Sequence, residues 1–381
     1  MSKKDISIPM AIPDRPRVAL IHYWLTGMRG GEKVLEALCR MYPQADIFTH
    51  VADPPALSDT LRAHKITETF IGRLPAAKSK YQAYLPLMPR ALEGVDLTGY
   101  DLVISSEAGP AKGVIVPPDC FHLCYCHSPM RYLWDQYHVY RAGTGRVQKL
   151  AMSVFAHGLR QWDVTSAARV DAFAANSNHV ADRIRKYWRR DAAVVAPPVA
   201  VEDFAPVADV GDSYLWLGEL APYKRPDIAV EAFSRLGLPL TIIGGPQKTV
   251  DALKAGAKDN VTFLGKTDFA TLKDHLARCR ALIFPGEEDF GIVPVEAMAS
   301  GRPVIAYGRG GACDSVVDGK TGLLFPHQSV ADLVAAVERF EAERLYDVDP
   351  QALVEHAAGF AESAFRAGIE ALIPAHLRPA G

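Results

Sequence analysis

Several features that would narrow the class of this protein are scarce or missing in its sequence. Only six of the 381 residues are cysteine, which is too few at this length for a disulfide framework. The formal net charge of −2 excludes a globally basic nucleic-acid-binding protein, though not a local basic patch. No apolar run approaches the ~20 residues of a membrane-spanning helix, and residues 1–16 lack the apolar stretch of a signal peptide. These absences predict a cytoplasmic protein that binds no nucleic acid.

Two groups of metal-ligating residue types are better explained without a metal. Segment 122–127 contains two histidines and two cysteines, but the cysteines alternate in the apolar run FHLCYC. This alternation indicates a buried strand with both thiols on one face, and it lacks the C-x2-C spacing of a structural zinc site. The pair Asp347 and Asp349 follows no apolar strand, which indicates solvated loop residues. We therefore expect no metal site, and we expect no cofactor.

Strand-like and helix-like segments alternate along almost the whole chain. Short, nearly continuous apolar runs such as 240–243 are typical of parallel strands that are covered on both faces. Two prolines and an acidic loop, ending near residue 212, divide the alternation into two series. Two such series predict an α/β protein with two doubly wound parallel sheets, each a Rossmann-like domain, facing a cleft. The expected domains are 1–196, 197–355 and a C-terminal helix in 356–381 that packs back towards the N-terminal domain. Single helices are expected over 78–92 and from residue 350 towards residue 373.

The most informative stretch is 285–301, PGEEDFGIVPVEAMASG. It follows a strand-like run and places Glu288 in a loop before a helix that carries Glu296. Pro294 suits the first turn of a helix, and the free N–H groups of 291–293 would form an anion site at the helix start. Glu288 could accept hydrogen bonds from sugar hydroxyls, and Glu296 could accept them from a ribose. Either glutamate on its own would be interpreted as a solvated or helix-capping carboxylate. The ordered combination of a strand, an acidic loop, Phe-Gly and a helix, with the two glutamates eight positions apart, is much harder to obtain by chance.

Glu288 and Glu296 resemble the E-x7-E pattern of the retaining glycosyltransferases of family four, also called group 1. The surrounding sequence, which matches almost without a break through 290–306, resembles FG-[IL]-V-P-x-EAMA-x-G-x-PVIA. Further similar segments occur at 30–38, 101–107, 126–134, 173–184, 220–233, 260–266 and 318–325. The resemblance therefore covers nearly the whole chain, and it implies the GT-B fold and a metal-independent retaining transfer of a hexose.

The resemblance also assigns roles to individual residues. Lys224 is similar to the lysine that contacts the donor diphosphate as it departs, and His127 to the histidine near the transferred sugar. Glu288 is similar to the residue that holds the sugar hydroxyls, and Glu296 to the ribose ligand. In this family no enzyme nucleophile is clearly identified, and the donor phosphate is thought to take the acceptor proton.

The remaining donor-site residues are also inferred from the resemblance. Gly30 and Gly31 resemble a glycine-rich loop after the first strand, where phosphate and acceptor approach the backbone. Gly265 and Lys266 follow the strand whose loop packs on the base, and Phe290, Gly291, Ile292 and Val293 form the helix start. One position departs from the family pattern: Glu219 stands where an arginine usually precedes the lysine by five residues. Arg225 could supply the missing positive charge, or it could be a solvated helix residue.

A basic segment with interleaved apolar residues lies at 62–90. It carries six lysines and arginines against one glutamate, and such a segment suits contact with an anionic membrane. A solvated helix face over its own core is an equally good interpretation. The resemblance to bacterial envelope-polysaccharide α-mannosyltransferases favours GDP-mannose as the donor and a lipid-linked or polysaccharide acceptor at the inner face of the cytoplasmic membrane. The alternatives are a UDP-hexose donor, a weakly active nucleotide-binding partner of an assembly complex, and an epimerase acting on the nucleotide sugar.

Overall fold

The computed structural model describes residues 15–379, which form two compact units. The first unit comprises 15–125, 130–173 and 369–379, and the second comprises 126–129 and 174–368. The expectation for the N-terminal stretch concerns residues that lie mostly outside the described part. Residues 369–379 belong to the first unit, where the Tyr42 hydroxyl donates a hydrogen bond to the Leu377 carbonyl at 3.2 Å.

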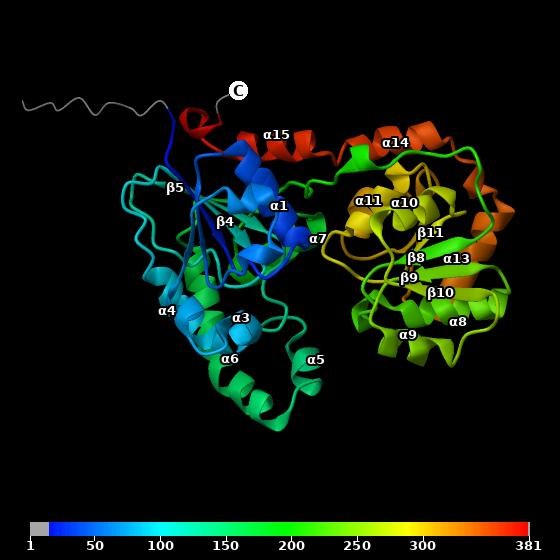
Figure 1. Ribbon diagram of the computed structural model, residues 1–381, viewed down its shortest axis with the longest axis horizontal. Helices are drawn as coiled ribbons and strands as arrows, with labels where there is room; N and C mark the ends of the chain where they lie inside the picture. The colour runs from blue at the N-terminus through cyan, green and yellow to red at the C-terminus, as the bar shows by residue number, and fades with distance from the viewer. Residues whose placement is uncertain (1–14, 380–381) are drawn as a thin grey trace, which may run out of the picture. The chain divides into compact units, whose positions relative to one another are not determined.

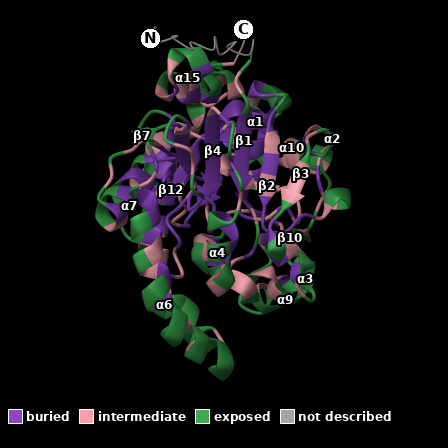
Figure 2. Cartoon of the chain, turned by 90° about the vertical axis from the view of Figure 1, so that its left-hand side faces the viewer, coloured by how far each residue is buried: buried purple, intermediate pink, exposed green. Residues whose placement is uncertain are grey.

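The first sheet has seven strands in the order β3-β2-β1-β4-β5-β6-β7 (Figure 1). Neighbouring strands pair in parallel, for example β1 with both β2 and β4. The chain order reverses at β1 and β4, which is the switch point of a doubly wound sheet. In Figure 2 the strands β1 and β4 are buried, because helices such as α1 cover the sheet. The strands are β1 (Val18–His22), β2 (Asp46–Thr49), β3 (Ile66–Glu68), β4 (Leu102–Glu107), β5 (Phe121–Cys126), β6 (Ala172–Ala175) and β7 (Ala193–Val194).

The helices of this half of the chain are α1 (Gly30–Met41), α2 (Asp59–Arg62), α3 (Ala77–Lys80), α4 (Met88–Glu93), α5 (Tyr137–Ala142), α6 (Arg146–Ala167) and α7 (Asn178–Trp188). The single helix predicted over 78–92 is wrong. A 3-10 helix, Tyr81–Leu87, separates α3 from α4 and contains Pro86. Because proline has no N–H and clashes with the preceding turn, it interrupts the α-helical hydrogen bonds at this point.

The second sheet has six strands in the order β10-β9-β8-β11-β12-β13, and its neighbouring strands also pair in parallel. It again reverses order, here between β8 and β11. The fold is therefore α/β with two doubly wound parallel sheets, as predicted. The strands are β8 (Tyr214–Leu217), β9 (Leu240–Ile243), β10 (Val261–Gly265), β11 (Leu282–Phe284), β12 (Val304–Tyr307) and β13 (Gly322–Phe325).

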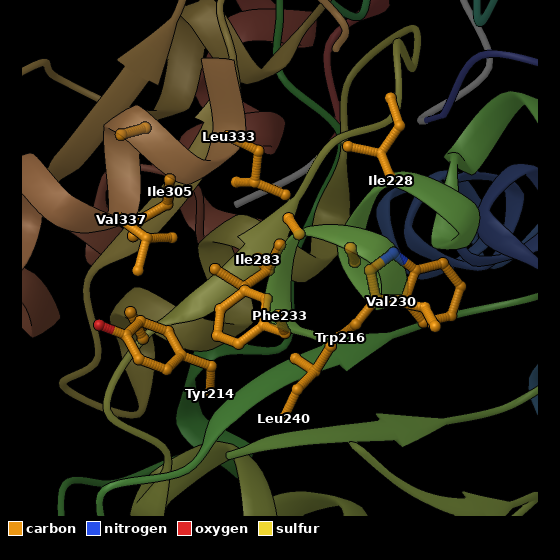
Figure 3. Packing of buried hydrophobic residues seen from close by; sticks show 14 of the residues in the cluster. Tyr214, Trp216, Ile228, Val230, Phe233, Leu240, Ile283, Ile305, Leu333 and Val337 are labelled. Atoms are coloured by element: carbon orange, nitrogen blue, oxygen red, sulfur yellow. The ribbon is translucent and has the colours of Figure 1, made fainter. Parts of the chain in front are cut away.

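Apolar side chains cover both faces of the second sheet. On one face, helices α8 (Pro226–Leu236) and α13 (Val330–Ala342) pack Phe233, Leu333 and Val337 onto Tyr214 and Ile283 (Figure 3). On the other face lie α10 (Phe269–Arg278), α11 (Ile292–Ala299) and α14 (Pro350–Ala358). Helices α9 (Gln247–Lys254), α12 (Ala312–Ser315) and α15 (Glu362–Leu372) complete the described chain. The long helix predicted beyond residue 350 is wrong, because the chain leaves the helix between α14 and α15, near Gly359.

The segment that contains cysteines and histidines is confirmed as a buried strand. Cys124 and Cys126 lie in β5, and both side chains are buried. His122 lies on the same strand, and its Nε2 is 2.9 Å from the Ser105 hydroxyl. No group of side chains with metal-binding geometry occurs among residues 15–379. Within the same range, no helix combines the length and apolar character needed to cross a bilayer.

Candidate active site

The predicted strand, loop and helix around the two glutamates are present in the second unit. Strand β11 ends at Phe284, the loop runs through Glu288, and α11 begins at Ile292. Gly291 caps this helix with a φ of 87°, a region in which a side chain would be strained. A Cβ at Gly291 would also press on the ring of Phe284 at 3.0 Å. Glycine is therefore required for the sharp turn that opens the start of α11.

Lys224 and Glu288 form a direct ion pair in the second unit. The Lys224 ammonium donates to Glu288 Oε1 at 2.7 Å, and the two side chains are only 15% and 18% exposed. Lys224 closes a 3-10 turn, Pro222–Lys224, after strand β8, and its ammonium lies over Gly218. The Glu288 carbonyl accepts a hydrogen bond from the Gly311 N–H at 2.8 Å, which ties this loop to the segment before α12. The lysine and the first glutamate of the predicted pattern are thus brought together.

Glu296 lies on the first turns of α11 and is partly buried. The pKa of its carboxyl is raised from 4.5 to about 7, mainly by burial and also by the negative charge of Asp203, while the positive charge of Lys224 opposes both. Among the described residues, no hydrogen-bond donor reaches this carboxyl group. When it is ionised, this carboxylate can therefore accept hydrogen bonds from hydroxyl groups of a ligand.

A second ion pair joins the loop that carries Glu288 to α7, and its arginine also binds the segment after β5. Arg183, on the inner face of α7, donates to Asp289 Oδ1 at 3.1 Å and to the Ser128 hydroxyl at 2.6 Å. It also donates to the Pro129 carbonyl at 3.1 Å. Segment 126–129 therefore belongs with the second unit, and His127 lies there beside Asp289. Burial lowers the pKa of His127 to about 4, against the opposing effect of the Asp289 charge, so the imidazole is neutral at pH 7.

Arg183 was not among the predicted site residues. It lies in the basic run 183–190, whose charges by themselves indicate the solvated face of a helix. Val180, Arg183 and Ile184 nevertheless share the spacing of one helix face, and all three are buried. An arginine on an apolar stripe signals a buried partner, and this is the sequence signal that could have identified it.

Glycines follow the ends of β8 and β9, where the two strand ends lie close together. Gly244 has a φ of 123°, and a Cβ there would overlap the carbonyl oxygen of Gly218. Gly245 has a φ of 76°, and a Cβ there would collide with the side chain of Leu220. Neighbouring strand ends can approach this closely only without side chains. Of the predicted pair Gly265 and Lys266, the glycine ends β10 with a φ of 68° and the lysine is exposed.

Arg225 binds a neighbouring carboxylate and a glutamine, and Glu219 is exposed to solvent. The Arg225 guanidinium donates from Nε and Nη2 to the Asp227 carboxylate, and its Nη1 donates to Gln328 Oε1 at 3.3 Å. Gln328 in turn donates to the Pro285 carbonyl at 2.8 Å, which ties this arginine to the glutamate loop through one side chain. Glu219 is exposed, so water solvates its charge.

Gly30 and Gly31 lie in the first unit, and their local structure differs from the expectation. They are the first two residues of α1 and do not form a loop, because the Glu32 carboxylate accepts the Arg29 N–H at 3.1 Å and starts the helix there. A Cβ at Gly31 would overlap the hydroxyl of Tyr23. The side chain of Tyr23 therefore lies directly against the backbone of Gly31.

Part of the chain is similar in sequence to known proteins. Residues 211–358 match the family model described as Glycosyl transferases group 1. The D-inositol 3-phosphate glycosyltransferase of Mycobacteroides abscessus is 31% identical over 218 residues, 51% of this chain and 49% of that protein. The protein of the same description from Streptomyces bingchenggensis is 30% identical over 232 residues, 52% of this chain and 50% of that protein. The chain thus spans about half the length of these relatives.

Solved structures match over nearly the whole chain. Anabaena Alr3699/HepE in complex with UDP and glucose has a TM-score of 0.68 at 17% identity, covering 94% of this chain and 99% of that one. Sucrose-phosphate synthase from Thermosynechococcus elongatus has a TM-score of 0.69 at 19% identity, covering 94% and 97%. These similarities confirm the GT-B fold with two Rossmann-like domains. The match to the model of group 1 glycosyl transferases lies within the second unit.

Proposed function

We propose that this protein is a retaining, metal-independent glycosyltransferase that moves a hexose from a nucleoside-diphosphate sugar to an acceptor. The observation that carries the proposal is the Lys224–Glu288 pair beside the start of α11, with the partly buried carboxyl of Glu296 on the same helix. A cation, an anion-binding helix start and two carboxyl groups are the parts that a sugar joined to two phosphates requires. The match of residues 211–358 to group 1 glycosyl transferases supports the same reading.

Each group has a distinct part in donor binding. Lys224 would bind the diphosphate, and the N–H groups of 290–293 at the start of α11 would donate hydrogen bonds to the same phosphate oxygens. Glu288, released from Lys224, would accept hydrogen bonds from the sugar hydroxyls. Glu296 would accept hydrogen bonds from the ribose.

The remaining predicted residues complete the proposed site. Gly265 and Lys266 would lie against the base, and Arg225 would add positive charge beside the phosphates. His127, neutral at pH 7 because its pKa is about 4, would donate or accept a hydrogen bond near the transferred sugar. Gly30 and Gly31 would let acceptor and phosphate approach the backbone at the start of α1.

The proposed reaction breaks the bond between the anomeric carbon and the donor phosphate oxygen, which leaves with the electron pair. The acceptor hydroxyl bonds to the anomeric carbon on the same face, and its proton passes to the departing phosphate. The sugar carries positive charge in the transition state, while negative charge grows on the phosphate. Lys224 and the amides of α11 would stabilise that growing negative charge, and this stabilisation is the main catalytic contribution we assign to the protein.

The donor is proposed to be GDP-mannose, on the resemblance to envelope-polysaccharide mannosyltransferases. A UDP-hexose is the second candidate, and one observation favours it: the similar structure of Alr3699/HepE is described with UDP and glucose. Release of GDP or UDP from each donor, measured with a coupled product-nucleotide assay, decides between them. Turnover with UDP sugars alone would reject GDP-mannose, and turnover without any acceptor would indicate an epimerase.

Lys224→Ala tests the site itself. Loss of a charge-assisted hydrogen bond of about 1.5–3 kcal/mol predicts roughly 10- to 100-fold weaker binding of the product nucleotide, together with loss of transfer. Lys248→Ala, an exposed lysine on α9, is the matched control and should bind normally in calorimetry. Unchanged binding and turnover in Lys224→Ala would refute the proposed mechanism. Retained nucleotide binding by the parent protein with no transfer to any acceptor would instead favour a nucleotide-binding partner of an assembly complex. That alternative is considered because Glu219 stands where the family pattern usually has an arginine.

The acceptor is proposed to be lipid-linked or a polysaccharide, with peripheral contact to an anionic membrane through 62–90. The basic side chains of this segment support the proposal, since Lys78, Lys80 and Arg90 are exposed. Its apolar side chains give less support, because Met88 is buried and Tyr84 packs on the same core cluster. Replacing Lys78, Lys80 and Arg90 by Ser should reduce vesicle binding in a flotation assay; equal flotation would make them ordinary surface charges.

A further inference from the structure

A different surface of the first unit combines exposed apolar side chains with positive charge. We call α5, the connecting residues 143–145 and the first part of α6 the α5–α6 hairpin; the two helices pack against each other. Val147 and Leu150 are 82% and 67% exposed, which is unusual for large aliphatic side chains. The large hydrophobic residues exposed on this hairpin are Val139, Tyr140, Val147, Leu150, Val154 and Phe155. So many on one short hairpin form a patch of the kind that marks an interaction site.

The apolar residues of α6 lie on the side of the helix that its core contacts leave free. Val147, Leu150 and Val154 follow the three- and four-residue spacing of one helix face. Further along, Ala156 and Leu159 are buried and attach the helix to the core. Figure 2 shows this division, with α6 green along its projecting part and strands β1 and β4 purple. The exposed stripe is therefore additional to the face that the fold uses.

The hairpin is positively charged throughout. Between residues 136 and 162 there is no aspartate or glutamate, whereas there are four lysines and arginines. Arg160 is engaged, because its Nε donates to the Leu133 carbonyl and its guanidinium lies 4.6 Å from the centre of the Tyr137 ring. Arg141 and Arg146 are exposed and Lys149 is partly exposed, beside the apolar stripe.

We propose that the α5–α6 hairpin docks on the surface of an anionic phospholipid membrane, with its apolar stripe among the acyl chains and its basic residues at the headgroups. An interfacial helix of this kind needs an apolar face, flanking lysine or arginine, and no membrane-spanning length. A second copy of the chain fits less well, because two-fold pairing of this surface would bring like charges together. The inference does not depend on the donor, since vesicle binding is measured without any nucleotide.

Flotation with vesicles of phosphatidylcholine and phosphatidylglycerol tests the proposal. The parent protein should float with anionic vesicles, should not float with pure phosphatidylcholine, and should bind less at high salt. Arg146→Glu with Lys149→Glu should weaken binding at least about 30-fold, because each basic residue near such a surface contributes about 1 kcal/mol. Leu150→Glu with Val154→Glu should weaken it by at least tenfold. Lys254→Glu with Lys320→Glu, two exposed lysines of the second unit, makes the same charge change and should retain binding.

A fluorescent label gives an independent measurement that does not rely on loss of binding. Leu150→Cys in a Cys313→Ser background, labelled with an environment-sensitive dye, should show a blue shift on adding anionic vesicles. A label at Val210→Cys in the same background should not. Equal flotation of the hairpin variants and the control, or a label at 150 that stays in water, would overturn the proposal. A blue shift without vesicles that grows with protein concentration would also overturn it, in favour of a second copy.

Discussion

The raised pKa of Glu296 makes a prediction about stability that can be worked through with its sign. The pKa is 4.5 in an unfolded chain and about 7 in the folded protein, because burial disfavours the charged form. Between these values the folded state keeps a proton that the unfolded chain has lost. The free energy of unfolding therefore falls as the pH rises through this window. At about 1.4 kcal/mol per pKa unit, the loss amounts to roughly 3 kcal/mol from pH 4.5 to pH 8.

Glu296→Gln removes the titration and should flatten this part of the pH profile. Urea unfolding at several pH values, compared between the parent protein and the variant, measures the difference while the other titrating groups cancel. We expect the variant to gain stability relative to the parent as the pH rises, by up to about 3 kcal/mol at pH 8. Glu202→Gln, an exposed neighbour, is the control and should follow the parent. Parallel profiles for Glu296→Gln and the parent would refute the reasoning.

The same group links stability to ligand binding in the proposed function. A ribose that donates hydrogen bonds to Glu296 favours its ionised form, so binding should release a proton near neutral pH. Affinity for the product nucleotide should then rise as the pH increases from 6 to 8. Calorimetry in buffers of different ionisation enthalpy would count the released proton, and Glu296→Gln should release fewer.

Two further predictions concern parts of the fold that support the site. Gly244→Ala should fail to fold or lose several kcal/mol, because its Cβ would overlap the Gly218 carbonyl, whereas Gly237→Ala, with open space around it, should lose only about 1 kcal/mol; thermal unfolding separates them. In the first unit, Lys112 is fully buried between the carboxylates of Glu107 and Asp163, so Lys112→Met should lose about 3–5 kcal/mol at pH 7. Part of that loss should be recovered in urea unfolding at pH 5, where a buried carboxyl can take up a proton.

The strands were predictable wherever the sheet buries them on both faces. The run at 240–243 coincides with β9, because continuous apolar residues leave little choice of boundary. Strand β3 was missed, since its three residues are only partly buried or exposed and form no apolar run. Helix interruptions were harder still. A proline can begin a helix as well as break one, so Pro86 could not be placed without the tertiary structure.

The candidate site was predictable where its residues are close in sequence and not where they are distant. Glu288 and Glu296 were found because one loop and one helix carry both. The contact between Lys224 and Glu288 joins residues 64 positions apart, so only the order of strands β8 and β11 brings them together. The buried bridge from Arg183 to Asp289 spans 106 positions and was missed for the same reason.

The Lys224–Glu288 pair gives a physical reason why the proposed site can remain folded without a ligand. Two partly buried charges left unpaired would each be costly, whereas the ion pair neutralises both. On the proposed function, a donor would replace both partners at once: its phosphates would take the lysine, and its sugar hydroxyls would take the glutamate. Neither charge is then left without a partner in either state. A nucleoside monophosphate, which brings phosphate charge but no transferable hexose, should therefore bind far more weakly than the complete donor, because it takes Lys224 and leaves Glu288 unpaired.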